Sequence, residues 1–170
     1  RENRALAGRL SFGAGLDCFC YAGGFALNMA KSCEEVEAID ISESAIELAK
    51  KNAQLNGISN IQFETGSVFD RLKLYDTQKR KFDTIVLDPP AFAKSRAHVE
   101  AAVRGYREIN IRAMRLLDSG GLLITCSCSQ HVDENAFLNI LTEAASDARR
   151  RVQVIEKRTQ GKDHPFLLSM

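Results

Sequence analysis

The sequence FDTIVLDPPAF, residues 82–92, joins an apolar run to an acid, two prolines and an aromatic ring. The apolar, β-branched run is typical of a strand that is buried on both faces of a parallel sheet. Asp88 ends this strand. The two prolines hold the following loop in one shape, because each fixes φ and removes an N–H donor. A plain turn does not require all of these features, so the segment indicates a strand end with a function.

Strand-like and helix-like stretches alternate on both sides of this segment. Strands are predicted to end at Asp17 and Asp40, and others to lie within residues 60–69, 81–90, 121–129 and 151–158. Helices are predicted over residues 25–31, 44–57, 99–117 and 134–148. Such alternation predicts an α/β fold with a mainly parallel, doubly wound sheet and helices on both faces. Ligands of such sheets bind beyond the carboxyl ends of the strands.

The helix that follows Asp40 has two candidate N-caps. Ser42 and Ser44 can both cap it, and Ser44-x-x-Glu47 has the spacing of a capping box. Gly57 is expected to end it.

Composition limits the class of protein. The chain has 170 residues, 45% of them hydrophobic, which fits one globular domain with a sizeable core. The net charge of +1 provides no general basic field for nucleic acid, so an RNA substrate would need a local patch or a partner domain. The five cysteines include no C-x-x-C pair, so we expect no metal site and a reducing, cytoplasmic compartment. No apolar run is long enough to cross a bilayer, so no membrane partner is expected.

The predicted first two strands frame a nucleotide-binding pattern. Asp17 ends the first strand and is followed by a loop that contains Gly23 and Gly24, whose backbone a ligand can approach closely. Asp40 ends the second strand, where an acid can accept the hydroxyls of a ribose. The loop is not G-x-G-x-x-G, so an adenosine without phosphates, as in S-adenosylmethionine (SAM), suits it better than a dinucleotide. The alternative is an ordinary strand-to-helix turn in which Asp40 only caps a helix.

Asp88 and Phe92 lie beside this predicted cofactor cleft. A rigidly held carboxylate can bond the polar edge of a planar base, and the aromatic ring can stack on the base or wall the pocket. A rigid turn with a core phenylalanine is the alternative.

Cys128 lies at the end of the predicted fifth strand, between two serines. A thiolate is a suitable nucleophile for an electron-poor carbon if its pKa is lowered. A cysteine in an apolar strand is more often a core residue, and Cys126 fits that interpretation. Arg104, Tyr106 and Arg107 near a helix start suit phosphate and base contacts, although a solvated helix face is nearly as compatible.

Five segments together resemble one known family. They are LDCFCYAGGFALNMA (16–30), AIDISESAIELAKKNAQLNG (38–57), FDTIVLDPPAF (82–92), GYREIN (105–110) and ITCSCS (124–129). Their order and spacing resemble the catalytic domain of the ribosomal RNA large subunit methyltransferase I family. These are SAM-dependent enzymes that methylate cytosine C5 in 23S ribosomal RNA. The resemblance covers nearly the whole chain, including RENR (1–4) and DHP (163–165).

The resemblance implies a Rossmann-like class I methyltransferase fold for residues 1–170. The PUA-like and linker domains of the family, and its last strand or strands, are expected to lie outside this sequence. It implies SAM as cofactor, RNA as substrate, no metal, and a possible homodimer. The implied cofactor-binding residues are Asp17, Phe19, Tyr21, Gly23, Asp40, Ile41, Ser67, Val68 and Asp88. Family members commonly carry an acid in the loop where this chain has Gly66-Ser67.

The resemblance makes Cys128 the nucleophile and Asp88 the active-site acid, and the expected substrate-binding residues are Pro89, Phe92, Tyr106 and Arg104. We expect the thiolate to add to C6 of the base so that C5 can take a methyl group. Uracil C5 would use the same chemistry, whereas methylation of an exocyclic amine would need no thiol. A small-molecule methyltransferase and a non-catalytic SAM-binding module are further alternatives.

Overall fold

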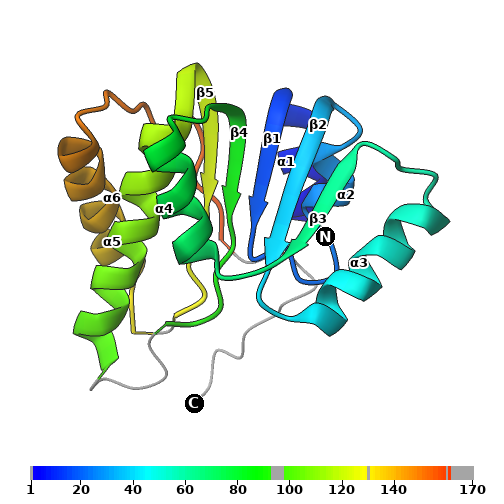
Figure 1. Cartoon of the computed structure of the whole chain (residues 1–170). Coiled ribbons are helices and arrows are strands. Elements are labelled where there is room, and N and C mark those ends of the chain that lie inside the picture. The colour runs from blue at the N-terminus through cyan, green and yellow to red at the C-terminus, as the bar shows by residue number, and fades with distance from the viewer. Residues whose placement is uncertain (1, 93–97, 130, 160, 162–170) are drawn as a thin grey trace.

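A five-stranded parallel sheet organises the chain, whose computed structural model describes residues 2–92, 98–129, 131–159 and 161. The strand order is β3-β2-β1-β4-β5, and every neighbouring pair is parallel. Helices lie on both sides of the sheet (Figure 1). The strands are β1 (Gly13–Cys18), β2 (Cys33–Asp40), β3 (Ile61–Thr65), β4 (Phe82–Leu87) and β5 (Leu117–Thr125). The predicted α/β, Rossmann-like fold with a doubly wound parallel sheet is confirmed.

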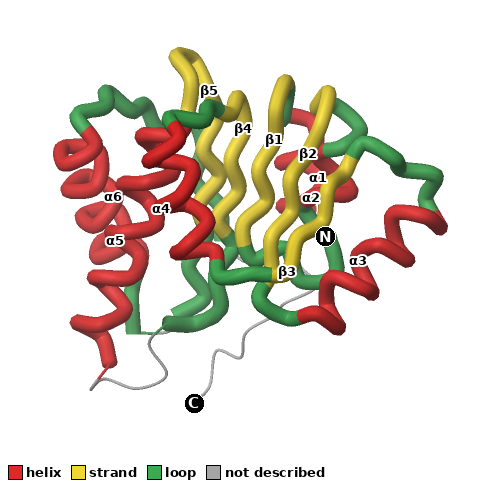
Figure 2. The backbone as a smooth tube through the Cα atoms, in the orientation of Figure 1, coloured by secondary structure: helices red, strands yellow, loops and turns green. Residues whose placement is uncertain are grey.

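The helices form two layers with the sheet between them (Figure 2). One layer contains α1 (Glu2–Leu10), α2 (Ala26–Met29) and α3 (Glu43–Leu55). The other contains α4 (Val68–Gln78), α5 (Val99–Leu116) and α6 (Glu134–Ala148), with α6 packed along α5. Since the strands are parallel, each connection returns over a face of the sheet, and this requirement produces both layers.

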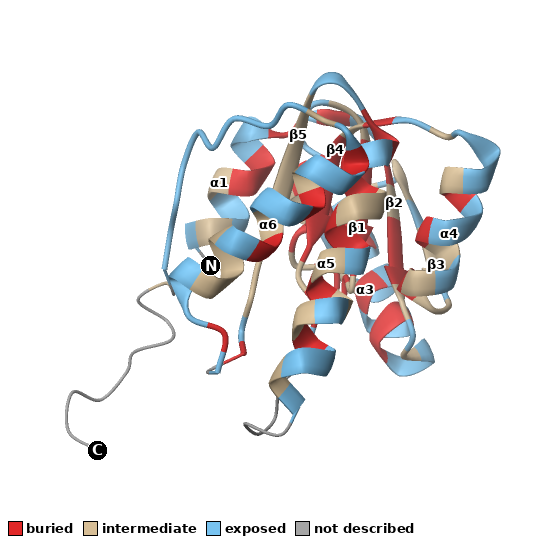
Figure 3. Cartoon of the chain, turned by 90° about the vertical axis from the view of Figure 1, so that its left-hand side faces the viewer, coloured by how far each residue is buried: buried red, intermediate tan, exposed pale blue. Residues whose placement is uncertain are grey.

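Alternating strand residues supply the two cores. Leu16, Ile85 and Leu87 pack with α4, α5 and α6, whereas Ala38 and Val86 pack with α1, α2 and α3. This alternation follows from the two-residue period of a strand. The central strands and the inner helix faces are buried, and the outer helix faces are exposed (Figure 3). A fully buried leucine or isoleucine contributes about 1.5–3 kcal/mol.

The register aligns the carboxyl ends of four strands. Cys18 of β1 is paired with Ile39 of β2 and with Leu87 of β4, and Leu87 is paired with Thr125 of β5. The residues that follow these positions therefore lie along one edge of the sheet. The strand order reverses between β1 and β4, which is where open α/β sheets bind their ligands.

The predicted strand over residues 151–158 is wrong. Residues 151–159 are exposed and have no regular secondary structure, and no described strand pairs with them. Val152, Val154 and Ile155 alternate with polar residues as in a strand, but all are at least 49% exposed. A strand requires a neighbour to bond its backbone, and sequence alternation alone cannot supply one.

Two helices were not predicted, namely α1 and α4. In α4, Val68, Leu72 and Tyr75 are buried at helical spacing, and the side chain of Ser67 caps the helix by accepting the N–H of Asp70. The sequence prediction treated this region as the loop after the third strand. The buried part of α1 is only Ala7 and Gly8, which leaves little hydrophobic periodicity to detect.

The cap of α3 resolves the choice between two serines. Ser42 is the N-cap, and its side chain accepts the N–H of Ala45. Ser44 lies inside the helix, where its hydroxyl is 3.0 Å from that of Ser42. The capping-box interpretation of Ser44 and Glu47 is therefore wrong.

Candidate active site

The loop after β1 has three residues with positive φ, two of which are not glycine. Phe19, Tyr21 and Gly23 have φ values of 65°, 47° and 82°. Positive φ is costly for residues other than glycine, so neighbouring groups must hold this shape. The N–H of Cys20 bonds to Ile39 O at 3.0 Å, and the N–H of Gly23 bonds to Cys20 O at 2.8 Å. The loop is thus fastened to the end of β2.

The side chain of Asp40 also holds the loop after β1 against the end of β2. Its Oδ2 accepts the N–H of Tyr21 at 2.8 Å, and its Oδ1 accepts the N–H of Ser42 at 2.9 Å. Each carboxylate oxygen retains a further lone pair, so the half-buried group can still accept hydroxyls. Tyr21 and Ile41, on either side of this contact, are 66% and 77% exposed. Large apolar groups exposed beside a carboxylate are well suited to a nucleoside.

Asp17 is a buried acid that is only partly satisfied. Its Oδ2 accepts the N–H of Ala26 at 2.7 Å, whereas Oδ1 has no partner among the described residues. Burial raises the pKa of Asp17 to about 8, the Ala26 N–H opposes the shift, and the charges of Asp88 and Asp40 add to it. An unpaired buried carboxylate oxygen is costly, and such groups are found where a ligand binds.

Asp88 lies next to this group at the end of β4. Its N–H bonds to Cys18 O at 3.3 Å, so the start of the proline loop is joined to β1. The side chain is half-buried, and burial raises its pKa, although the positive charge of Arg4 and a hydrogen bond with Cys126 act in the opposite direction.

The cysteines of the chain differ sharply in their surroundings. Cys18, Cys20 and Cys33 are buried, Cys126 is half-buried and Cys128 is exposed. Burial and the charge of Asp88 raise the pKa of Cys126 to about 12. The pKa of Cys128 is raised by partial desolvation and by Asp88, while a backbone N–H lowers it. Cys128 is therefore the thiol that a large substrate could reach.

Cys128 and Asp88 converge on the proline loop. β5 ends at Thr125, so Cys128 lies in the segment after the strand and not, as predicted, at its end. The Sγ of Cys128 donates to Pro89 O at 3.5 Å, so the thiol of this segment touches the loop that follows β4. Pro89 is buried and Pro90 is exposed. The structure thus brings together an acid and a thiol that are far apart in the sequence.

An aromatic wall lies beside this pair. The ring of Phe92 is 4.7 Å from that of Tyr106 and 6.3 Å from that of Phe19, measured between centroids. Tyr106 is fully buried, and its hydroxyl lies 3.0 Å from Ser129 Oγ and 3.2 Å from Ser127 Oγ. Tyr106 supports the wall from behind. Because it is fully buried, it does not offer a surface that a base could contact.

Arg4 is a site residue that the sequence reasoning did not single out. It reaches from α1 to the loop after β1, where a Cβ on Gly24 would lie 2.8 Å from Arg4 Nε. Its positive charge lowers the pKa of both Asp88 and Asp17. The only sequence signal was the place of this arginine in the segment RENR.

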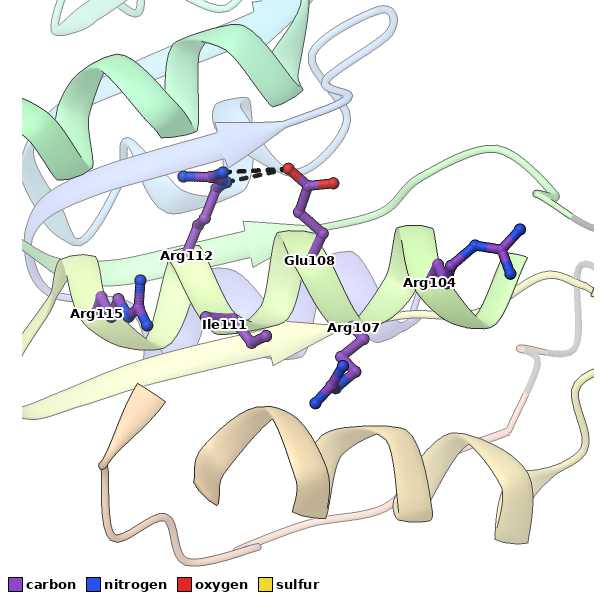
Figure 4. A pocket seen from close by; sticks show the side chains of 6 residues that line it. All are labelled: Arg104, Arg107, Glu108, Ile111, Arg112 and Arg115. Atoms are coloured by element: carbon purple, nitrogen blue, oxygen red, sulfur yellow. Dashed lines mark hydrogen bonds and ion pairs between the residues drawn. The ribbon is translucent and has the colours of Figure 1, made fainter. Parts of the chain in front are cut away.

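Arg104 lies in a different region, a pocket of ≈ 290 Å³ on the outer surface of α5 (Figure 4). Its lining residues are Arg104, Arg107, Glu108, Ile111, Arg112 and Arg115. The Arg104 side chain is 73% exposed, with a distant ion pair to Glu100 at 3.9 Å. The structure does not bring Arg104 to the acid and thiol.

The remaining predicted cofactor residues, Ser67 and Val68, begin α4. Val68 is buried in the core beneath the aromatic wall, and Ser67 is occupied as the N-cap. Within the described residues, no three His, Cys, Asp or Glu side chains are grouped so that they could hold a metal ion. None of the described helices has the length and apolar character needed to span a membrane.

Comparisons with known proteins agree with this geometry. A family model described as a methyltransferase domain matches residues 13–167. The chain is 46% identical over 170 residues to the ribosomal RNA large subunit methyltransferase I of Tolumonas auensis, and 44% identical to that of Aeromonas hydrophila subsp. hydrophila. Each alignment covers 98% of this chain and 43% of the relative, so the chain spans less than half the length of these relatives.

A solved structure agrees in fold. The crystal structure of SMU.776 in complex with SAH (S-adenosylhomocysteine) superimposes with a TM-score of 0.84 and 18% identity, over 98% of this chain and 44% of the other. At this level of identity the likeness concerns the fold alone.

Proposed function

Because this chain belongs to the ribosomal RNA large subunit methyltransferase I family, we propose that it is the catalytic part of an enzyme that methylates C5 of a cytosine in large-subunit ribosomal RNA. The single observation that supports this most is the meeting of Cys128 with the Asp88 loop at the carboxyl edge of the sheet. A methyltransferase that acts on a nitrogen or oxygen needs no thiol at this position.

The carboxyl edge fits SAM as the cofactor. Asp40 would accept the ribose hydroxyls, and Tyr21 and Ile41, which are exposed, would flank the adenosine. The unpaired Oδ1 of buried Asp17 suits the cationic end of the cofactor, with Gly23 leaving the loop backbone open to it. Ser67 and Phe19 would line the neighbouring side of the cofactor, with the buried Val68 packed behind them. When bound, SAM supplies an electrophilic methyl group on a sulfonium centre.

C5 of a pyrimidine is a weak nucleophile and does not attack a methyl donor unaided. Cys128 is the residue that would activate it. The thiolate adds to C6, which gives C5 enamine character and allows it to take the methyl group. A base then removes the proton from C5, and the electron pair of that bond re-forms the C5–C6 double bond as Cys128 leaves. The raised pKa of Cys128 means that the thiol must lose its proton before or during the addition.

Asp88 recognises the base and stabilises the adduct. Its carboxyl group bonds the N3 and N4 edge of cytosine, held there by the buried Pro89 and the proline that follows. The base must leave its stack to reach the thiol, and Phe92 receives its face. Tyr106 positions Phe92 from behind, and Arg104, exposed in the second turn of α5, contacts the RNA backbone.

One experiment separates this proposal from its nearest alternatives. Nucleosides of large-subunit ribosomal RNA are analysed by mass spectrometry from cells with and without the intact gene. We expect the loss of one 5-methylcytidine. Loss of 5-methyluridine would keep the thiol mechanism and change the base. Loss of an N-methylated purine would refute the role of Cys128, and unchanged RNA would refute the RNA substrate and favour a small-molecule substrate or a non-catalytic module.

A further inference from the structure

The position of Arg4 is fixed by close packing of the first two helices. Gly8 of α1 lies so near α2 that a Cβ would be 2.6 Å from Asn28 O. The side chain of Asn28 donates in turn to Gly24 O at 2.9 Å. Through this contact, α1 is held against the loop that carries Gly23 and Gly24. The guanidinium of Arg4 lies over that loop as a consequence of packing.

The loop leaves space for the Arg4 head group. Gly24 has no side chain, and a Cβ there would lie 2.8–3.0 Å from the Nε, Cζ and Nη1 atoms of Arg4. The Cζ of Arg4 also lies 5.9 Å from the centroid of the Phe25 ring, within the range of a cation–π contact. Arg4 therefore lies beside the strand end that carries Asp17.

Arg4 makes no ion pair with a described residue, although two acids lie near enough for their pKa values to respond to it. The arginines of α5 contrast with it, since each has an acidic partner within 4.0 Å. Arg4 is also exposed. An unpaired guanidinium and an unpaired carboxylate oxygen, on Asp17, are thus present at the same edge of the sheet.

These two groups are complementary to the amino-acid end of SAM, which carries an ammonium, a sulfonium and a carboxylate. The oxygens of Asp17, Asp40 and Asp88 can accept hydrogen bonds from the ammonium, but a negative charge on any of these groups repels the carboxylate. A guanidinium matches a carboxylate in charge and in bidentate geometry. We propose that Arg4 binds the α-carboxylate of SAM, and that Gly24 is required because it leaves the Arg4 head group in place. This inference rests on the proposed cofactor.

The test compares two ligands that differ by one group. Dissociation constants of SAH and of decarboxylated SAH, which keeps the ammonium, are measured by calorimetry on the full-length protein. Arg4→Gln is expected to weaken SAH binding roughly ten- to hundredfold and to leave decarboxylated SAH unchanged, because one charge-assisted pair is lost. Arg4→Lys keeps the charge and loses the bidentate geometry, so an intermediate loss is expected. Arg9→Gln, on the same helix, is the matched control and should bind both ligands normally.

Gly24→Ala tests the same contact from the other side. The added Cβ displaces the guanidinium, so SAH binding should fall several-fold while decarboxylated SAH binding is retained. Equal losses for both ligands would show that Arg4 only supports the loop and would overturn the proposal, as would unchanged SAH binding in Arg4→Gln. A loss of RNA affinity with normal SAH binding would make Arg4 a phosphate contact instead. If the wild-type protein bound RNA but neither ligand, the proposed cofactor itself would fail.

Discussion

The outer surface of α5 and the carboxyl edge of the sheet are both rich in charge, but they differ in how that charge is satisfied. On α5, Arg107 pairs with Glu143 and Asp147 of α6, and Arg112 pairs with Asp76 of α4 and with Glu108. At the carboxyl edge, Asp17 keeps an unpaired oxygen, and Arg4 has no ionic partner among the described residues.

This difference distinguishes side chains that stabilise the fold from side chains that are available to bind a ligand. The ion pairs of Arg107 and Arg112 join α5 to α6 and α4 and leave these side chains little capacity for a ligand. Arg104 differs, because among the described residues it pairs only with Glu100 of its own helix and is 73% exposed. The buried, unpaired oxygen of Asp17 costs stability in the free protein, and this cost is recovered when a ligand bonds to it.

The largest effect is expected at the thiol. Cys128→Ala should reduce methyl transfer by at least about 1000-fold, because the nucleophile is lost, while the affinity for SAH is unchanged. Single-turnover transfer to ribosomal RNA and calorimetry with SAH measure the two quantities. Cys33→Ala, at the opposite end of the sheet, is the control and should remain active. Substantial turnover by Cys128→Ala would remove the covalent mechanism and with it the functional contrast between the two regions.

Asp88→Asn should change activity and thiol reactivity in opposite directions. Methyl transfer should fall about 100-fold as the base loses its recognition group. The negative charge of Asp88 raises the pKa of Cys128, so its removal lowers that pKa and raises the thiolate fraction at neutral pH. Alkylation of Cys128 by iodoacetamide, followed by peptide mass spectrometry at pH 7.5, should therefore be faster. The exposed Asp70→Asn is the control, and slower alkylation in Asp88→Asn would contradict the electrostatic argument.

Asp17 should make the stability of the free protein depend on pH. Its folded pKa of about 8 lies above the ordinary value of 3.8, so the folded chain keeps a proton that the unfolded chain has lost. The free energy of unfolding should therefore fall as pH rises through this window, by at most about 1.4 kcal/mol per pH unit. Asp17→Asn should remove this decline, as measured by urea unfolding at pH 5.5, 6.5 and 7.5. A decline of equal slope in both proteins would assign it to other groups.

The smallest effect is expected on α5. Arg104→Ala should weaken RNA binding about threefold and reduce the salt dependence by about one counterion, as for a single phosphate contact. Arg112→Ala should leave RNA binding unchanged, because Arg112 is only 21% exposed and pairs with both Asp76 and Glu108. Filter binding across a salt series measures both variants. Equal effects of the two substitutions would show that α5 acts as a general basic surface, and the contrast with the carboxyl edge would weaken.

Most of the fold could be predicted from the sequence, because the spacing of apolar residues indicates which face of a helix or strand is buried. The fourth strand and the helix over residues 134–148 were predicted correctly, since each has a strong and uninterrupted pattern. Helix α1 was missed because few of its residues face the core, and α4 was missed because its first residues were interpreted as the loop after the third strand. The segment 151–158 was predicted as a strand because its residues alternate, yet formation of a strand depends on a partner elsewhere in the chain.

The sequence by itself determined that acids end or follow apolar runs and that Cys128 comes shortly after one, because residue type and local order are fully contained in it. Only the tertiary structure decided that Cys128 is exposed while Cys126 is half-buried, that Tyr106 is a buried support, and that Arg4 reaches the same edge as Asp17. Burial, charge pairing and pKa depend on the neighbours of a group in space. In a parallel sheet those neighbours come from strands and helices that are distant in sequence.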